Sequence, residues 1–270
     1  MVPVASRPRP ALPSLQSMSP NAVMQEPGSK ERWAQGLPQE MDFWSGWIRT
    51  RGLDWKADFE KALTPGRPLA QVFINHLKTP PGGTVHLLDV GSGPLSVLAG
   101  VQWNDRTIKT TAIDPLADDY NRALANAGVI PLLPVLKGEA ESLTSLFAPS
   151  TFDLVHASNC IDHSYDPVLA IRQMVEVVKP GCFVLLEHAV NEAEKNAYQG
   201  LHQWNFGVDE CGSLRVWRPG FSRNIEDALE DIARVSSTVF ERPGGNWLSV
   251  RIRKLIPQPR SLLGFLKSRP

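Results

Sequence analysis

The stretch VHLLDVGSGPLSVLAG, Val85–Gly100, decides the fold. It is a short apolar run that ends in an acid, followed by a glycine turn and a second apolar run. Runs of this kind predict a buried strand at Val85–Val90 and a helix at Ser96–Trp103. In open α/β sheets such a turn lies at the carboxyl end of its strand, where backbone amides can approach a ligand. The pattern therefore predicts a small-molecule site at Gly91 and Gly93.

The chain beyond this stretch alternates strand and helix patterns, which predicts a doubly wound, mostly parallel α/β sheet. The predicted strands are Lys109–Asp114, Leu132–Leu136, Phe152–Ala157 and Phe183–His188, and the predicted helices are Asp118–Gly128 and Pro167–Val178. The last segment, STVFERPGGNWLSVRIRKL, has two β-rich runs joined by Pro243–Asn246. This hairpin signal predicts an antiparallel strand at the end of the sheet.

The segment before the sheet divides into a tail and a helical cap. Prolines interrupt residues 1–38, so we expect a disordered tail there. With Arg7, Arg9 and several serines, the tail also has the composition of an organellar transit peptide. Residues 39–80 should form helices. The predicted apolar faces are Met41, Trp44, Trp47 and Ile48 in the first helix and Leu69, Val72, Phe73 and Leu77 in the second. The main domain should then span 81–256, with a C-terminal tail at 257–270.

Composition narrows the function classes. The 270 residues carry 28 basic and 28 acidic side chains, so nothing marks a nucleic-acid-binding protein. Cys160, Cys182 and Cys211 are widely spaced and odd in number, which favours a reducing, cytoplasmic location over a disulfide framework. No apolar run approaches the roughly 18 residues of a membrane span. We therefore expect no nucleic-acid or membrane partner.

Acidic residues follow the predicted strands in a specific order. Asp89 ends the first strand, and Asp114 ends the second, where a carboxylate can accept hydrogen bonds from both hydroxyls of a ribose. GEAESL then offers Glu139 and Glu141 after the third strand. With FDLVHASN, VVKPGCFVLLEH and the terminal hairpin, these motifs resemble the class I S-adenosylmethionine-dependent methyltransferases, of the small-molecule, methyltransferase-type-11-like kind. The resemblance covers roughly residues 85–254.

This resemblance implies a seven-stranded Rossmann-like methyltransferase fold and S-adenosyl-L-methionine as the cofactor. It implies that Gly91, Ser92 and Gly93 pass under the amino-acid part of the cofactor and that Asp89 orients the ammonium group. It further implies the following contacts: Asp114 with the ribose, Glu139 and Ala140 with the adenine, and Asn159 near the sulfonium. The loop departs from the family's glycine-rich pattern at Pro94, which lacks an amide donor, and Glu141 is a competing choice for the adenine contact.

The chemistry itself requires little of the protein. A sulfonium methyl is already activated, so alignment of the acceptor and exclusion of water carry most of the reaction, and a base is needed only for some acceptors. His163, His188 and His202 are the candidate catalytic residues. His202 lies in a predicted insertion at about 195–220, LHQWNFGVDECGSLRVW, which reads as two strands that could form a lid over the cofactor.

No metal site is predicted. Glu187, His188, Glu192 and Glu194 are close in sequence, but a strand end followed by a loop does not place them on one face. The expected function is methyl transfer to a small molecule through a hydroxyl, carboxylate or other heteroatom. Two alternatives remain open: a nicotinamide-dependent oxidoreductase on a related scaffold, and a catalytically silent protein that binds S-adenosylmethionine.

Overall fold

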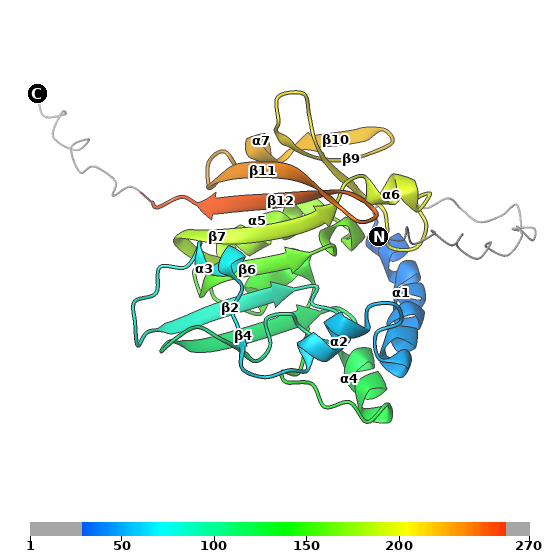
Figure 1. The fold of residues 1–270 in the computed structure, drawn as a ribbon. Coiled ribbons are helices and arrows are strands. Elements are labelled where there is room, and N and C mark those ends of the chain that lie inside the picture. The colour runs from blue at the N-terminus through cyan, green and yellow to red at the C-terminus, as the bar shows by residue number, and fades with distance from the viewer. Residues whose placement is uncertain (1–28, 258–270) are drawn as a thin grey trace, which may run out of the picture.

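The computed structural model of this protein describes residues 29–257, and its centre is a seven-stranded sheet (Figure 1). In order across the sheet, the strands are β11 (Ala233–Arg242), β12 (Gly245–Lys254), β7 (Val178–Ala189), β6 (Phe152–Ser158), β2 (Thr84–Val90), β4 (Thr107–Asp114) and β5 (Leu136–Lys137). β12 pairs antiparallel with β7 and β11 pairs antiparallel with β12, whereas the other neighbours pair in parallel. The predicted mostly parallel sheet with an antiparallel terminal hairpin is confirmed.

Strand β2 lies at the point where the chain changes direction across the sheet. It pairs with β4 on one side and with β6 on the other, because the chain builds β4 and β5 first and then returns. Val85, Leu87, Leu88 and Val90 of β2 are buried, as expected for a strand covered on both faces. The carboxyl ends of β2 and β6 therefore form a topological switch point, the usual place for a ligand in open α/β sheets.

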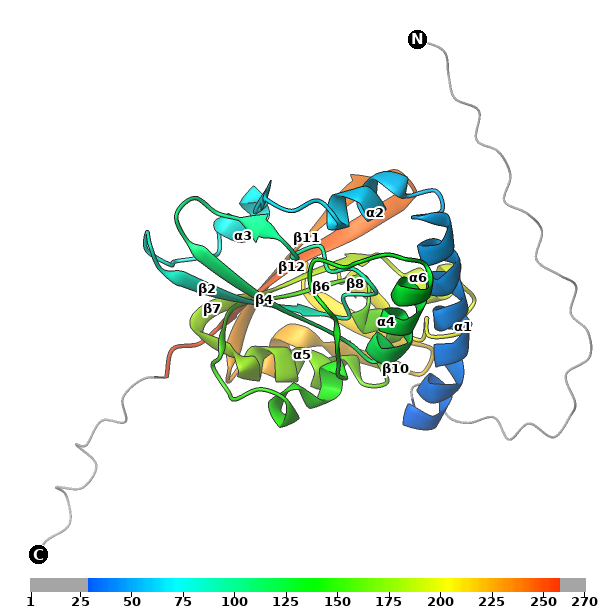
Figure 2. The same cartoon turned by 90° about the horizontal axis from the view of Figure 1, so that it is seen from below.

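Helices cover both faces of the sheet and the edge where the parallel strands end. Helix α5 (Pro167–Val177) lies on one face, and the short helices α2 (Lys56–Ala62) and α3 (Gln71–Ile74) lie toward the other (Figure 2). Helices α1 (Lys30–Thr50) and α4 (Ala117–Asn126) contact each other at the end to which the parallel strands point (Figure 1). None of the helices within residues 29–257 combines the length and apolar character needed to cross a membrane.

The predicted helix Ser96–Trp103 is wrong. Turns follow the glycine loop, and then the short strand β3 (Val101–Gln102) pairs in parallel with β1 (Arg67–Pro68). The Ser96 hydroxyl donates to Asp89 and accepts from Leu98 N, and Gly100 has a φ of 64°. These local hydrogen bonds and the pairing with β1 outweigh the helical spacing of the apolar side chains.

The predicted boundary at residue 38 is also wrong, because α1 begins at Lys30 with Ser29 as its N-cap. Ser29 Oγ accepts from Arg32 N at 3.1 Å. The helix continues through Pro38 although proline removes one backbone donor. In the same part of the helix, Gly36 packs closely against Leu201, where a Cβ would meet the leucine at 2.6 Å. The rest of the predicted tail, residues 1–28, lies outside the described residues, as do 258–270 of the C-terminal tail.

Two further elements are shorter than the sequence pattern predicts. Residues 67–77 form only β1 and the single turn of α3, and Val72 of the predicted apolar face is 46% exposed. The predicted strand Leu132–Leu136 is reduced to the two residues of β5 at the edge of the sheet. An edge strand has one neighbour only, so few backbone hydrogen bonds reward its extension.

The insertion after β7 is larger than predicted and reaches Asn224. It contains α6 (Glu192–Lys195) and a three-stranded antiparallel sheet of β8 (Asn205–Val208), β9 (Leu214–Arg218) and β10 (Phe221–Asn224). The predicted pairing of two strands about a polar turn is confirmed in β8 and β9. Their side chains join the main hydrophobic core together with α7 (Ile225–Leu229), so these strands pack as part of the core.

Candidate active site

A cavity of about 490 Å³ lies at the carboxyl ends of β2, β4 and β6, beneath α1. Cavities of this size accommodate small molecules and cofactors. The strand ends supply its floor, from Asp89–Leu95, Asp114–Leu116, Gly138–Glu141 and Ser158–Ile161. The wall above comes mainly from Trp33, Leu37, Glu40, Trp44, Trp47 and Trp55. All eight residues that the sequence predicts for the cofactor therefore line one cavity.

The glycine loop has a backbone that only glycine accepts without strain. Gly91 has a φ of 61°, and a Cβ there would lie 2.6 Å from Cys160 Sγ. Gly93 has a φ of 63°, and a Cβ there would meet the ring of Trp44 at 3.3 Å. The two glycines thus allow the chain to turn sharply after β2 and to expose backbone to the cavity.

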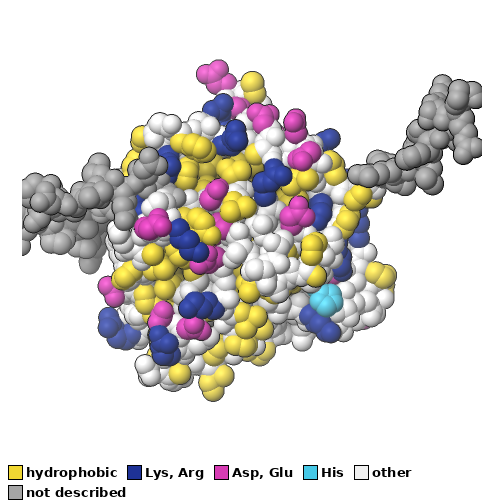
Figure 3. Space-filling view, turned by 180° about the vertical axis from the view of Figure 1, so that it is seen from behind, with side chains coloured by type: hydrophobic (Ala, Val, Ile, Leu, Met, Phe, Trp, Pro, Cys, Tyr) yellow, Lys and Arg dark blue, Asp and Glu magenta, His cyan; other side chains and the backbone are white. Residues whose placement is uncertain are grey.

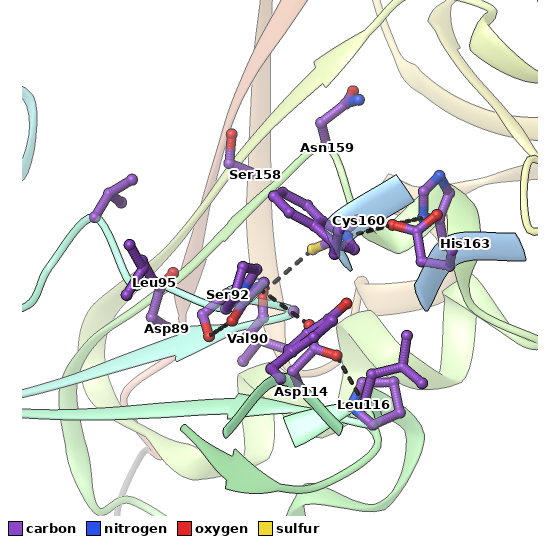
Figure 4. Close-up of a pocket in the computed structure, with 18 of the residues that line it drawn as sticks. Asp89, Val90, Ser92, Leu95, Asp114, Leu116, Ser158, Asn159, Cys160 and His163 are labelled. Atoms are coloured by element: carbon purple, nitrogen blue, oxygen red, sulfur yellow. Dashed lines mark hydrogen bonds and ion pairs between the residues drawn. The ribbon is translucent and has the colours of Figure 1, made fainter. Parts of the chain in front are cut away.

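Asp114 is the best-defined polar group of the cavity floor. Its Oδ2 accepts from Gly93 N at 3.1 Å and its Oδ1 accepts from Leu116 N at 2.9 Å (Figure 4). Burial raises the pKa of Asp114 to about 6, against the opposing effect of these two amide donors. The carboxylate therefore fixes the glycine loop, and each oxygen retains a further lone pair for a ligand.

Asp89 borders the same cavity, but both of its oxygens have internal partners. Ser96 Oγ donates to Oδ2 at 2.6 Å, and His156 Nδ1 lies 2.8 Å from Oδ1. The residue is 2% exposed. Asp89 thus joins the glycine-loop segment to β6. The sequence analysis did not identify His156. Alternation along FDLVHASN indicates the face of the strand on which His156 lies, but not the residue with which it forms a hydrogen bond.

The two glutamates after β5 have different surroundings. Glu141 accepts from Tyr165 N at 2.8 Å and Asp166 N at 3.3 Å, so it holds the segment that leads into α5. Burial raises its pKa to about 7. Glu139 contacts Lys30 Nζ at 2.6 Å and accepts from Tyr165 OH at 3.2 Å, at the rim of the cavity. Lys30 was assigned to the tail by sequence and is a new member of this site.

Asn159 follows β6 in a left-handed conformation with a φ of 50°. Its Oδ1 accepts from Ala189 N at 2.9 Å, and its own N–H donates to Glu187 O at 2.7 Å. Figure 4 shows its side chain directed away from Asp114. Asn159 therefore joins the ends of β6 and β7 at the border of the cavity.

The three candidate histidines come together around Asp162, a residue that the sequence analysis did not select. His202 Nδ1 lies 3.1 Å from Asp162 Oδ2, and His163 Nε2 lies 3.4 Å from the same oxygen. His163 Nε2 and His202 Nδ1 are 3.0 Å apart. His188 approaches from β7, with its Nδ1 3.7 Å from Asp162 Oδ1. Only His163 of the three lines the cavity.

The charges of this cluster follow from burial and from the mutual contacts. Burial alone would raise the pKa of Asp162, but the neighbouring histidines outweigh it and hold the pKa at about 2. Burial lowers the pKa of His188 to about 4, and its ring stacks on Phe206 with centroids 4.3 Å apart. Burial would lower the pKa of His202 as well, yet its hydrogen bond with Asp162 raises it above the usual value.

The predicted lid residues of the insertion mostly face the core. Trp204 is buried, and its Nε1 donates to Ser164 O at 2.9 Å. Within the segment 192–224, Leu201 alone lines the cavity. The cover over the cavity is instead the aromatic face of α1: Trp47 packs on Phe59 at 4.9 Å, and Trp44 lies over Gly93. The sequence predicted this apolar face without deciding what it covers.

Comparisons with known proteins agree with this architecture. Residues 88–186 match the family model described as a methyltransferase domain. No curated protein sequence matches the chain significantly. Among solved structures, the CurJ carbon methyltransferase is 17% identical, with a TM-score of 0.45 over 65% of this chain and 50% of that one. The CMeT domain of the citrinin polyketide synthase is also 17% identical, with a TM-score of 0.46 over 69% of this chain and 50% of that one.

A SAM-dependent methyltransferase from Methanosarcina mazei is 16% identical, with a TM-score of 0.42 over 70% of this chain and 100% of that one. The chain thus spans half the length of the first two structures that it matches. The family match over 88–186, together with the strand order and the glycine loop, identifies a methyltransferase domain with a Rossmann-like fold.

Proposed function

We propose that this protein transfers a methyl group from S-adenosylmethionine to a small molecule bound in the cavity beneath α1. The observation that carries the proposal is the cavity itself: one cavity borders both the glycine loop and a wall of tryptophans with a few polar groups. Apolar walls with isolated polar side chains are typical of small-molecule sites. The acceptor atom is proposed to be a hydroxyl, carboxylate or other heteroatom.

The residues of the cavity floor fit the cofactor. Asp114 is proposed to accept hydrogen bonds from the ribose hydroxyls through the lone pairs that Gly93 N and Leu116 N leave open. Gly91, Ser92 and Gly93 are proposed to pass under its amino-acid part, because two left-handed glycines bring the backbone close to the cavity.

The remaining cofactor contacts are proposed for the edges of the cavity. Glu139 and Ala140 border it where the adenine would lie, and Lys30 holds Glu139 in place. Asn159 borders it near the proposed position of the sulfonium. With both oxygens engaged internally, Asp89 is proposed to reach the ammonium group through its remaining lone pairs, directly or through water.

When bound, the cofactor supplies an activated methyl group, so the protein must align the acceptor and exclude water. The acceptor lone pair forms the new bond to the methyl carbon as the sulfur–carbon bond breaks, and S-adenosylhomocysteine is released. Glu40 is the cavity-wall group proposed to receive a proton from an acceptor that must lose one. His163, with its Nδ1 3.8 Å from Glu40 Oε1, is proposed to orient this carboxylate. His188 and His202 are proposed to position His163 through Asp162.

A small-molecule acceptor is proposed in preference to nucleic acid. Basic and acidic side chains are equal in number, and on the face seen in Figure 3 they are interspersed among apolar ones. Nucleic-acid binding instead favours a clustered basic surface. The cytoplasmic location and the absence of a membrane partner stay predictions from composition.

The proposal is tested by titrating the full chain with S-adenosylhomocysteine and with NADH, followed by a methyl-release assay over a panel of hydroxyl, carboxylate, amine and thiol acceptors. We expect binding of S-adenosylhomocysteine alone and turnover with at least one acceptor class. Binding of NADH without S-adenosylhomocysteine would instead support the oxidoreductase alternative. Cofactor binding without turnover across the panel would support the catalytically silent alternative.

A variant separates the acceptor side from the cofactor side. His163→Ala is expected to lower turnover at least about tenfold, within the range that general acid–base groups contribute, while the affinity for S-adenosylhomocysteine changes less than about twofold. His76→Ala, which lies outside this cavity, is the matched control. Equal turnover by His163→Ala and the wild-type protein would contradict the role of His163.

A further inference from the structure

Three ligand-type atoms meet at one point behind the cavity wall. Asp162 and His163 lie in the 3₁₀ helix η2 (Ile161–His163), and His202 comes from the insertion. Asp162 Oδ2, His163 Nε2 and His202 Nδ1 form a triangle with sides of 3.0, 3.1 and 3.4 Å. His202 is 39 positions from His163 and 40 from Asp162 in sequence. The fold therefore brings one oxygen and two nitrogens from two separate segments together.

The size of this triangle matches the spacing of neighbouring ligands around a metal ion. With metal–ligand bonds of about 2.1 Å, adjacent ligand atoms are about 3.0 Å apart in octahedral geometry and about 3.4 Å apart in tetrahedral geometry. A cation about 1 Å above the plane of the triangle would lie within about 2.1 Å of all three atoms. The ligand atoms would not need to move apart to admit it.

Hydrogen bonds account for two sides of the triangle. Each neutral imidazole has one N–H and one lone pair, so an N–H on His202 Nδ1 can be shared between Asp162 Oδ2 and His163 Nε2. In that arrangement the third side brings the lone pairs of His163 Nε2 and Asp162 Oδ2 to 3.4 Å from each other. A cation allows all three atoms to present lone pairs to one centre.

The surroundings contain buried polar atoms without hydrogen bonds. Among residues 29–257, no hydrogen-bond partner is found for Asp162 Oδ1 or for either ring nitrogen of His188, whose Nδ1 lies 3.7 Å from that oxygen. Asp162 is 2% exposed and His188 is 1% exposed. Buried polar atoms normally have partners, so a group of them around one point suggests that a ligand belongs there.

We propose that Asp162, His163 and His202 bind a divalent first-row transition cation such as Zn²⁺, Fe²⁺ or Co²⁺. Two imidazoles and one carboxylate favour this class over Mg²⁺ and Ca²⁺, which prefer oxygen ligands. His188 faces the second oxygen of Asp162 at 3.7 Å, where it can orient the ligating carboxylate.

The site has a defined place in the fold. It joins η2, which follows β6, to the insertion after β7, and it lies directly behind His163 of the cavity wall. The sequence analysis predicted no metal because it considered Glu187, His188, Glu192 and Glu194 as one local group. The proposed ligands include none of these four, and the triangle depends on tertiary contacts between two separate segments.

The test is metal uptake by the full chain, which requires neither cofactor nor acceptor and so is independent of the proposed methyl transfer. The purified protein is stripped with a chelator, dialysed, and titrated with Co²⁺ by absorbance and with Zn²⁺ by calorimetry. We expect one equivalent of metal per chain and a metal-dependent rise in the melting temperature. Failure of the folded wild-type protein to bind either ion in stoichiometric amount would overturn the proposal.

Variants locate the site. His202→Ala should weaken Zn²⁺ binding at least about 100-fold, more than the 10–100-fold cost of losing an outer-shell partner. Asp162→Asn, which keeps the shape of the side chain, should weaken it at least about tenfold. His76→Ala, outside the cluster, should bind as the wild type does. Circular dichroism in the absence of metal confirms that each variant is folded, and wild-type affinity in a folded His202→Ala protein would refute the assignment.

Discussion

Replacement of Asp114 by asparagine tests the proposed cofactor site most directly. The carboxylate is buried and accepts from Gly93 N and Leu116 N, one on each oxygen. Asparagine offers one oxygen instead of two and removes the negative charge, so the proposed acceptor for two ribose hydroxyls is lost. A hydrogen bond to a charged group contributes about 1.5–3 kcal/mol. We therefore expect the dissociation constant of S-adenosylhomocysteine to rise at least about tenfold.

The pH dependence gives a second, independent signature of the same residue. Burial raises the pKa of Asp114 to about 6, and the proposed hydrogen bonds require the ionised form. The affinity for S-adenosylhomocysteine should therefore be highest well above pH 6 and should fall as the carboxylate is protonated at lower pH. At about pH 5 only about a tenth of the carboxylates are ionised, which predicts a dissociation constant about tenfold higher than at about pH 8. The Asp114→Asn protein should show no such change.

Isothermal titration with S-adenosylhomocysteine at both pH values measures these quantities. Asp118→Asn is the matched control, because Asp118 lies nearby but is exposed and pairs with Lys137 at 3.2 Å. The melting temperature of Asp114→Asn shows how far the loss of one of its hydrogen bonds to Gly93 N and Leu116 N lowers the stability of the fold. Unchanged affinity in Asp114→Asn, or the same pH profile in variant and wild type, would refute the reasoning.

Two stability predictions concern buried contacts near the cavity. Burial raises the pKa of Glu141 to about 7, so its contribution to the free energy of unfolding is complete below about pH 4.5 and is lost as the pH rises through 7. Urea unfolding should show Glu141→Gln gaining about 2–3 kcal/mol relative to wild type between about pH 5 and pH 8, and a constant difference would contradict this. Gly91→Ala should lower the free energy of unfolding by about 1–3 kcal/mol more than Gly82→Ala, because both have positive φ but only the first Cβ would clash, with Cys160 at 2.6 Å. Equal losses in the two glycine variants would show that the contact with Cys160 relaxes freely.

The sequence alone determined the sheet and the edge of it at which the glycine loop and Asp114 meet. Alternating apolar and polar patterns report which backbone conformation buries a face, and this information is local. The local pattern was therefore sufficient to predict β2, α5 and the terminal hairpin. Gly91, Gly93 and Asp114 could also be placed, because the carboxyl ends of neighbouring parallel strands must meet at one edge of the sheet.

Only the tertiary structure decided which side chains meet. The Ser96–Trp103 segment has helical spacing, yet its contacts with Asp89 and with β1 make it a series of turns. Helix α1 crosses Pro38 because packing against the insertion outweighs one missing hydrogen bond. Local propensity contributes less than about 1 kcal/mol per ordinary residue, so contacts of this kind override it.

The histidine cluster shows the same limit at the candidate site. The sequence selected His163, His188 and His202 as separate candidates, since each follows a strand or lies in the insertion. It had no means of identifying Asp162 as their common partner, because the contact between Asp162 and His202 joins residues 40 positions apart. Pairing over such a distance is set by how the insertion packs on the core, and a pattern along the chain does not encode the distance between two folded segments.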